Sequence, residues 1–223
     1  MDTNFWLTRW QDGRTNFHQT RVTPLLQKYW STLELPPGST VLVPLCGKSR
    51  DMVWLSEQGF RVVGVELSQL AVEQFFAENE LHPTVHQTAH ARHYVTERIE
   101  IICGDIFKVD AVLLAACTGV YNRGALVALP PAMRKDYVRD VYGQLSRGYQ
   151  GILITLDYAQ EQMAGPPFSV PDSEVQMLYT SHSDALVIDR RDISDKEPKF
   201  VERGLSALTT VVYCLRGKEK APA

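Results

Sequence analysis

The sequence predicts a doubly wound α/β domain, in which helices cover both faces of a mostly parallel sheet. Short apolar runs alternate with stretches of helical periodicity over residues 36–223. Most of these runs are continuously apolar, which is typical of strands buried on both faces. No linker divides the 223 residues, a length that suits one domain. We therefore expect a single domain over 1–223, with an N-terminal helical cover over 1–35 and an α/β core over 36–223.

The cover and the first βαβ unit are predicted from spacing. Residues 1–35 carry aromatic and leucine side chains at intervals compatible with one or two amphipathic helices, broken near 12–13. The apolar run 41–43 is the first strand, and it ends in a turn that contains a glycine. Helical spacing over 50–58 predicts the next helix, and 61–65 predicts a second buried strand.

The same alternation continues through the middle of the chain. A helix over 68–80 begins at a serine that can cap it, and the apolar run 99–103 is the third strand. Residues 117–121 predict a weaker fourth strand. A helix over 131–145 starts with proline, which is favoured in a first turn. The run 151–156 is the clearest strand of the chain.

The C-terminal part begins with a proline-rich loop at 165–171. A helix from Asp172 and two strands, near 185–189 and over 205–215, complete the predicted elements. Right-handed crossovers between parallel strands place ligands beyond the carboxyl ends of the strands. We therefore look for functional residues in the turns that follow strands.

Composition excludes several kinds of partner. The formal net charge of -3 offers no basic field for a phosphate backbone, so we expect no nucleic acid partner. No apolar run approaches the roughly 20 residues of a membrane span, and the N-terminus lacks the pattern of a signal peptide. We expect a cytoplasmic monomer that acts on a small molecule. The four cysteines, Cys46, Cys103, Cys117 and Cys214, form no Cys-x-x-Cys pair. Their spacing therefore argues against a zinc site or a dithiol redox site.

Two strand ends carry the residues that a nucleoside needs. Gly47 lies in the turn after the first strand, and Glu66 follows 19 positions later at the end of the second strand. Glycine permits close backbone approach, and a carboxylate can accept two hydrogen bonds from ribose hydroxyls. Asp105, after the third strand, can accept a hydrogen bond from an adenine amino group while Ile106 packs on the ring. The alternatives are a plain tight turn, a surface glutamate and a helix cap at Asp105.

The same turn excludes two phosphate-binding motifs. A P-loop requires glycine five residues before Gly47, where this chain has Leu42. A dinucleotide fingerprint requires three spaced glycines, and the turn has one. A nucleoside without phosphates is therefore favoured, and S-adenosylmethionine meets that condition.

Three histidines raise the question of a metal. His86, His90 and His93 would share one face of a helix, if a helix formed there. A proline precedes this polar stretch, which favours a solvated loop or helix. We therefore expect no metal site.

Five separated motifs, in this order, resemble the thiopurine S-methyltransferase family in its bacterial form. They are Trp6-x3-Trp10-x2-Gly13-Arg14-Thr15-x-Phe17-His18-Gln19, Pro44-Leu45-Cys46-Gly47-Lys48, Val63-Gly64-Val65-Glu66, Asn122-Arg123-Gly124-Ala125-Leu126-Val127-Ala128-Leu129 and Gly165-Pro166-Pro167-Phe168. The resemblance covers nearly the whole chain. It implies a class I, Rossmann-like methyltransferase fold with a seven-stranded sheet whose last strand is antiparallel. It also implies S-adenosylmethionine as methyl donor and S-adenosylhomocysteine as product.

The resemblance further implies the residues of the donor site. Those that match donor-binding positions of the family are Trp10, Leu45, Glu66, Leu67, Asp105, Ile106 and Arg123. Trp10 would close over the donor, where a tryptophan face beside a sulfonium gains about 0.5–2 kcal/mol of cation–π attraction. The alternative for Trp10 is an ordinary core tryptophan.

Four residues are candidates for binding the methyl acceptor. They are Phe17, Arg123, Phe168 and Arg203. Phe168 lies in the loop 165–171, whose prolines make it stiff enough to form a pocket wall, although a plain surface loop is the alternative. A thiopurine can enter as its anion, so we assign no general acid or base.

One position departs from the family pattern. This chain has Asn122 before Arg123 where the family usually has aspartate. Asparagine lacks the negative charge of aspartate. A salt bridge that orients Arg123 would therefore become a weaker, neutral hydrogen bond. The alternative is that Asn122 only ends the fourth strand.

Three functions fit these residues. The first is methyl transfer to the sulfur of a thiopurine or similar small thiol. The second is methyl transfer to another soft nucleophile, such as a halide, thiocyanate or an oxyanion of selenium or tellurium. The third is non-catalytic nucleotide binding, which the missing glycines disfavour.

Overall fold

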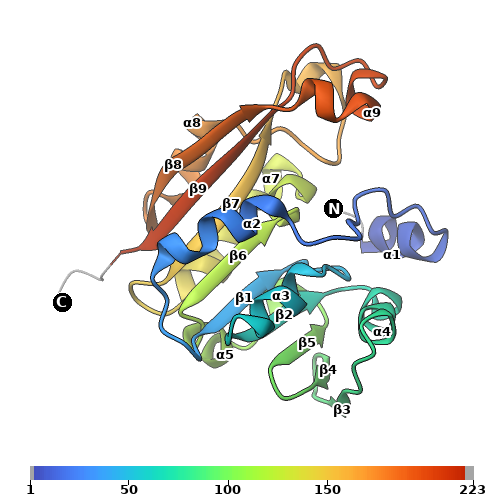
Figure 1. The fold of residues 1–223 in the computed structure, drawn as a ribbon, viewed down its shortest axis with the longest axis vertical. Coiled ribbons are helices and arrows are strands. Elements are labelled where there is room, and N and C mark those ends of the chain that lie inside the picture. Colours follow the sequence, from blue (N-terminus) through green and yellow to red (C-terminus); the bar gives the residue numbers. More distant parts are fainter. Residues whose placement is uncertain (1–2, 219–223) are drawn as a thin grey trace.

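A computed structural model of the chain describes residues 3–218, in which nine strands form one mixed sheet (Figure 1). The strand order is β3-β4-β5-β2-β1-β6-β7-β9-β8. The strands are β1 Thr40–Pro44, β2 Arg61–Glu66, β3 Thr84–Gln87, β4 Arg92–Val95, β5 Ile99–Cys103, β6 Gly119–Arg123, β7 Gln150–Asp157, β8 Ser183–Asp192 and β9 Thr209–Gly217.

Five neighbouring strands, β5, β2, β1, β6 and β7, run parallel. The strand β9 runs antiparallel to β7, and β8 runs antiparallel to β9. All seven sequence-predicted strands are therefore present. The sheet has two more strands than the sequence predicts, because a hairpin of β3 and β4 adds two antiparallel strands beside β5.

The hairpin also corrects the prediction of a loop or helix around the histidines. Every residue of β3 is exposed, so no apolar run marks this strand in the sequence. Pairing along the edge of β5 and the burial of Tyr94, whose ring stacks on Phe76 at 5.9 Å, hold the hairpin in place. Edge strands of this kind are recognised by tertiary pairing rather than by hydrophobic pattern.

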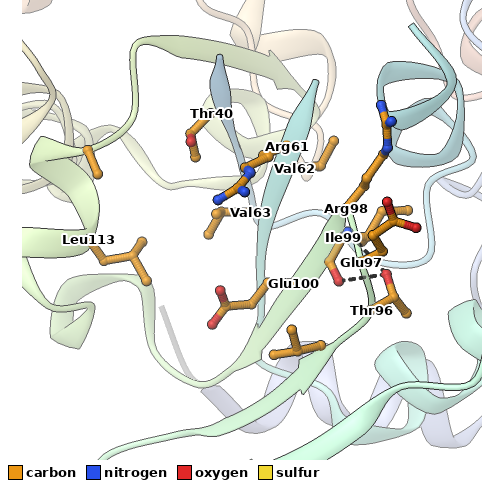
Figure 2. A pocket seen from close by; sticks show the side chains of 12 residues that line it. Thr40, Arg61, Val62, Val63, Thr96, Glu97, Arg98, Ile99, Glu100 and Leu113 are labelled. Atoms are coloured by element: carbon orange, nitrogen blue, oxygen red, sulfur yellow. Dashed lines mark hydrogen bonds between the residues drawn. The ribbon is translucent and has the colours of Figure 1, made fainter. Parts of the chain in front are cut away.

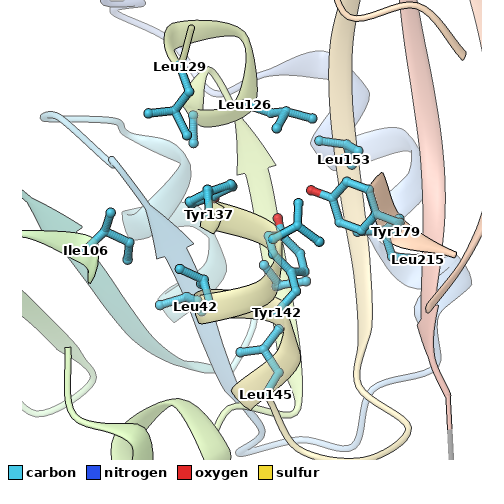
Figure 3. Packing of buried hydrophobic residues seen from close by; sticks show 14 of the residues in the cluster. Leu42, Ile106, Leu126, Leu129, Tyr137, Tyr142, Leu145, Leu153, Tyr179 and Leu215 are labelled. Atoms are coloured by element: carbon cyan, nitrogen blue, oxygen red, sulfur yellow. The ribbon is translucent and has the colours of Figure 1, made fainter. Parts of the chain in front are cut away.

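Apolar side chains pack on both faces of the sheet. In β1, Leu42 belongs to one buried cluster, whereas Val41 and Val43 belong to another on the opposite face. Figure 3 shows the first cluster, in which Tyr137 and Tyr142 lie among leucines from several elements. The α-helices are α1 Thr3–Gln11, α2 Pro24–Tyr29, α3 Asp51–Glu57, α4 Gln69–Glu78, α5 Ala111–Ala115, α6 Ala125–Ala128, α7 Pro131–Val141, α8 Asp172–Tyr179 and α9 Pro198–Val201.

The N-terminal segment, which we call the N-terminal cover, contains the helices α1 and α2. Helix α1 contacts α4, and α2 continues into a short 3₁₀ helix, Trp30–Leu33, that packs into the core. In Figure 1 the segment crosses from the middle of the sheet, at α2, to α1 beyond the carboxyl ends of β1 and β2. Between residues 3 and 218, no helix combines the length and apolar character that crossing a membrane requires.

Candidate active site

The turn after β1 has a backbone that suits close approach of a ligand. Leu45 and Gly47 both have positive φ angles, of 48° and 53°. A Cβ atom at Gly47 would lie 3.2 Å from the Trp10 ring, so a larger residue would press on the N-terminal cover. The Cys46 N–H donates to the Val65 carbonyl at 2.9 Å, which ties the turn to the end of β2. The sequence therefore needs glycine here for conformation and for space.

Glu66 is a buried carboxylate fixed by this turn. It is 7% exposed, and its Oε2 and Oε1 accept hydrogen bonds from the N–H groups of Gly47 at 2.9 Å and Ser68 at 2.8 Å. Burial raises the pKa of Glu66, and the backbone hydrogen bonds from Ser68, Gly47 and Leu67 oppose that shift. Each oxygen keeps acceptor capacity, since an ionised carboxylate offers about four lone-pair sites. The group can therefore accept two further hydrogen bonds from vicinal hydroxyls.

The end of β5 brings the other predicted nucleoside residues to the same edge. Gly104 donates its N–H to the Glu66 carbonyl at 2.9 Å. Asp105 follows and accepts a hydrogen bond from the Phe107 N–H at 3.1 Å, capping the 3₁₀ helix Ile106–Lys108. Capping occupies one carboxylate oxygen and leaves the second available. Ile106 is 7% exposed and packs in the first core cluster.

Aromatic residues of the cover lie against the turn. Trp10 is 4% exposed, and its ring lies over the side of Gly47 where a Cβ atom would stand. Phe17 packs edge-on against Trp10, with ring centroids 5.4 Å apart, and also against Trp6. Phe17 keeps 38% of its surface exposed. The two aromatic predictions therefore fall in one cluster beside the Glu66 turn.

Arg123 ends β6 at the same edge and is partly exposed. Among residues 3–218, no hydrogen bond or ion pair of its guanidinium is recorded. Burial lowers the pKa of His18, nearby Lys48 lowers it further, Glu78 raises it, and Arg123 lowers it again. His18 therefore lies near Arg123. From the sequence, His18 is named only as part of the first family motif, next to the acceptor candidate Phe17, and is assigned no role.

Asn122 does not orient Arg123, and the predicted link between them is wrong. Asn122 has no exposed surface; its Nδ2 donates to the hydroxyls of Tyr142 at 2.8 Å and Tyr137 at 3.1 Å. Its Oδ1 accepts from the Leu126 N–H at 3.3 Å. Successive strand side chains point to opposite faces, so Asn122 enters the first core cluster while its neighbours face the other way.

The remaining acceptor candidates lie around Tyr158, after β7. The Tyr158 hydroxyl donates to the Pro167 carbonyl at 2.6 Å, and the partly buried Phe168 donates its N–H to the Val127 carbonyl at 2.7 Å. Burial raises the pKa of Tyr158, while Arg203 is among the groups that lower it. Arg203 is exposed and lies 5.8 Å from the Phe200 ring centroid. No recorded contact joins Arg203 to Arg123 within the described residues.

Two surface hollows lie away from the Glu66 turn. One is lined by Thr40, Arg61 and Ile99, which begin three parallel strands (Figure 2). Glu66 stands at the opposite end of β2, so this hollow is separate from the nucleoside residues. The second, of about 420 Å³, lies between the starts of α7 and α8 and is lined by Arg134 and Glu174.

The histidines do not form the helical face that a metal site would have used. His86 and His93 pair across the hairpin, with nearly parallel rings 6.0 Å apart. His93 Nδ1 lies 2.6 Å from Glu100 Oε1. From residue 3 to 218, no three side chains of His, Cys, Asp or Glu are grouped so that they could hold a metal ion.

Solved structures with this fold define a class. A Burkholderia thailandensis 1,6-didemethyltoxoflavin-N1-methyltransferase, solved with its substrate and S-adenosylhomocysteine, is 17% identical with a TM-score of 0.63; the match covers 97% of this chain and 87% of that one. A mycolic acid cyclopropane synthase solved with S-adenosylhomocysteine is 12% identical with a TM-score of 0.61, covering 86% and 82%. The fold is that of the α/β methyltransferases.

Sequence comparison identifies the family within this class. The family model "Thiopurine S-methyltransferase (TPMT)" matches residues 1–218. A thiopurine S-methyltransferase of Bordetella pertussis is 67% identical over 215 residues, covering 96% of this chain and 98% of the relative. One of Nitrosomonas eutropha is 53% identical over 216 residues, covering 97% and 98%. The chain belongs to the thiopurine S-methyltransferase family.

Proposed function

We propose that the protein transfers a methyl group from S-adenosylmethionine to the sulfur of a thiopurine or a similar small thiol. The observation that carries this proposal is the buried Glu66 carboxylate, held by the backbone N–H groups of Gly47 and Ser68 where β1 and β2 end. Family membership adds the donor and the class of acceptor.

The residues at this edge fit the donor. Glu66 has acceptor capacity for two ribose hydroxyls, and the second Asp105 oxygen can accept from an adenine amino group. In the turn after β1, Leu45 and one glycine, Gly47, have left-handed backbone conformations. The turn lacks the three spaced glycines that bind a pyrophosphate in dinucleotide-binding proteins. A nucleoside bearing an amino acid suits this set better than a dinucleotide.

The bound donor supplies an activated methyl group on a positively charged sulfur. The protein's own contribution is alignment and the exclusion of water. Trp10 and Phe17 cover the turn, Phe168 walls the acceptor, and Arg123 attracts an acceptor that arrives as an anion. No side chain needs to remove a proton from such an anion, so we assign no general base.

The nine-stranded sheet is, in this proposal, a seven-stranded doubly wound core with the hairpin β3–β4 added at one edge. The order β5-β2-β1-β6-β7-β9-β8 and the antiparallel β9 support that interpretation. We expect residues 1–223 to belong to one domain, in which the segment 1–35 covers the site. We expect a cytoplasmic monomer without nucleic acid or membrane partners, in keeping with the net charge of -3.

The first prediction concerns the reaction itself. The purified protein should bind S-adenosylmethionine and S-adenosylhomocysteine with micromolar affinity in calorimetry, and methylate a thiopurine when the donor is labelled. NAD and ATP serve as controls and should bind far more weakly. Methylation of halide, thiocyanate or selenium and tellurium oxyanions in preference to any thiol would replace the acceptor part of the proposal. Donor binding without transfer to any acceptor in the panel would contradict catalysis.

A further inference from the structure

Arg134, on α7, is the bulkiest fully buried side chain among the described residues. A buried guanidinium is uncommon, because its charge and its five N–H donors require partners. Its Nη1 contacts both carboxylate oxygens of Glu174, at 2.8 and 2.7 Å. Glu174 lies in the first turn of α8, so this ion pair joins α7 to α8, two of the helices that pack in the first core cluster.

The same guanidinium holds two carbonyl groups near the proposed acceptor site. Its Nε donates to the Leu129 carbonyl at 2.9 Å, and its Nη1 donates to the Ser169 carbonyl at 3.0 Å. Leu129 follows α6, the helix that begins after Arg123. Ser169 directly follows Phe168. The Arg134 side chain therefore links the segment that follows Arg123 and α6 to the segment that carries Phe168.

Phe168 is the residue on which these contacts converge. The Arg134 Cζ lies 5.9 Å from the centroid of its ring, within the range of cation–π attraction. The Phe168 N–H is bound by the Val127 carbonyl, and the Ser169 hydroxyl accepts from the Tyr158 N–H at 3.0 Å. Hydrogen bonds from three separate segments therefore fix the backbone of Phe168 and Ser169.

We propose that Arg134 is a positioning residue for the methyl acceptor, which sets the place of Phe168 in the pocket wall. This inference rests on the proposed function, in which Phe168 contacts the acceptor. The Nε and Nη1 groups, fixed in one plane, hold Glu174 and two carbonyls together, and Nη2 is buried without a hydrogen-bond partner among the described residues. A lysine ammonium on its flexible stem cannot reproduce the fixed spacing of Nε and Nη1. Displacement of the wall would misalign the acceptor and leave the Glu66 turn, on distant strands, unchanged.

The test is the kinetics of Arg134→Lys, which keeps the charge and loses the fork. We expect the KM for a thiopurine to rise about tenfold, while the Kd for S-adenosylhomocysteine stays within about twofold of the wild type. Arg139→Lys is the matched control, since Arg139 is exposed on the same helix and pairs only with Asp136 and Asp140. A parallel loss of donor affinity in Arg134→Lys would overturn the inference.

A double-mutant cycle separates positioning from general support of the fold. If Arg134 acts through Phe168, Arg134→Lys should change the KM far less in a Phe168→Leu background than in the wild type. Equal effects in the two backgrounds would show that the guanidinium does not act through this ring.

Glu174→Gln keeps the test available if Arg134→Lys does not fold. It removes one charge and leaves both carbonyl contacts, so we expect a rise of about threefold in KM with unchanged donor Kd. If the wild-type protein does not methylate thiopurines, that result refutes the proposed function and not this inference. Hydrogen exchange of the Phe168, Ser169 and Val170 amides then decides: exchange in both variants as slow as in the wild type would overturn the role of Arg134.

Discussion

At the scale of the residue, the site depends on a carboxylate that is buried and still hydrogen-bonded. Glu66 accepts one N–H from each of two turns, which keeps both of its oxygens at defined positions. Burial disfavours the charged form of Glu66 and raises its pKa, and the backbone hydrogen bonds favour the charged form and limit that rise. A surface glutamate would need no such support.

Replacement of Glu66 should weaken donor binding and also loosen the turn. In Glu66→Gln, one carboxylate oxygen becomes an NH₂ group that cannot accept the N–H of Gly47 or Ser68. The hydrogen bonds to the ribose also lose their charge assistance, with a cost of about 2 kcal/mol, or about 30-fold in Kd. Calorimetry with S-adenosylhomocysteine measures the affinity, and circular dichroism checks that the variant is folded. Wild-type affinity in the folded variant would exclude Glu66 from the donor site.

The raised pKa of Glu66 also predicts how donor binding depends on pH. The ionised form accepts the ribose hydrogen bonds, so affinity is full above the folded pKa and falls as the pH drops through it. Because that pKa lies above the ordinary value of about 4.3, the loss begins at a higher pH than for an exposed glutamate. Calorimetry from pH 7 downwards should show this loss in the wild type, and a flat profile in Glu66→Gln. The same slope in both proteins would assign it to another group.

Asn122 has a structural role that can be measured by stability. Asn122→Leu removes the donor that two buried tyrosine hydroxyls share and the acceptor of the Leu126 N–H. Groups left without partners cost about 1–3 kcal/mol each, so the free energy of unfolding in urea should fall by at least about 2 kcal/mol. The KM for an anionic acceptor should change little in protein that remains folded, since Arg123 lies on the other face. A stable variant with an altered KM would restore the proposed link to Arg123.

At the scale of the element, one buried carboxylate adds a hydrogen-bonded link between the N-terminal cover and the sheet. Asp51, at the start of α3, accepts hydrogen bonds from the Thr23 N–H at 2.7 Å, the Thr23 hydroxyl at 2.8 Å and the Tyr121 hydroxyl at 2.9 Å. Tyr121 is two residues before Arg123 and shares its face of β6. The anchor therefore fixes the segment that carries Phe17 to the strand that carries Arg123.

Weakening this anchor should loosen the cover and leave the sheet intact. Thr23→Val removes one hydroxyl bond to a charged group, worth about 1.5–3 kcal/mol. We expect faster amide hydrogen exchange over residues 13–22, with unchanged exchange in β1. Thr32→Val is the control, because the Thr32 hydroxyl donates to the Tyr29 carbonyl in a solvent-exposed hydrogen bond and has no charged partner among the described residues. Equal exchange in the two variants would show that Asp51 does not hold the cover.

At the scale of the whole molecule, donor and fold are thermodynamically linked. A ligand that binds only the native state at 100 times its Kd adds about 2.7 kcal/mol. For a chain of this size that corresponds to a rise in Tm of about 5–10 °C. Thermal unfolding with and without S-adenosylhomocysteine measures the shift, and NAD at the same concentration should produce none. A shift that persists undiminished in Glu66→Gln would place the donor elsewhere.

Seven main strands, their order along the chain and the two strand ends where Gly47 and Glu66 meet were all predictable from the sequence. These features follow from local composition: continuous apolar runs mark buried strands, and glycine marks a turn whose backbone has positive φ. The pairing of Gly47 with Glu66 was predictable because parallel strands bring their carboxyl ends to one edge.

The tertiary structure was needed to show where β6 ends and which distant segments share a partner. The predicted fourth strand stopped at residue 121, which left Asn122 and Arg123 outside it; β6 extends to Arg123, so these two adjacent residues face opposite sides of the sheet. The hairpin β3–β4 depends on the free edge of β5, and the Arg134 contacts join residues up to 40 positions apart. Such contacts arise from packing, which local pattern does not encode.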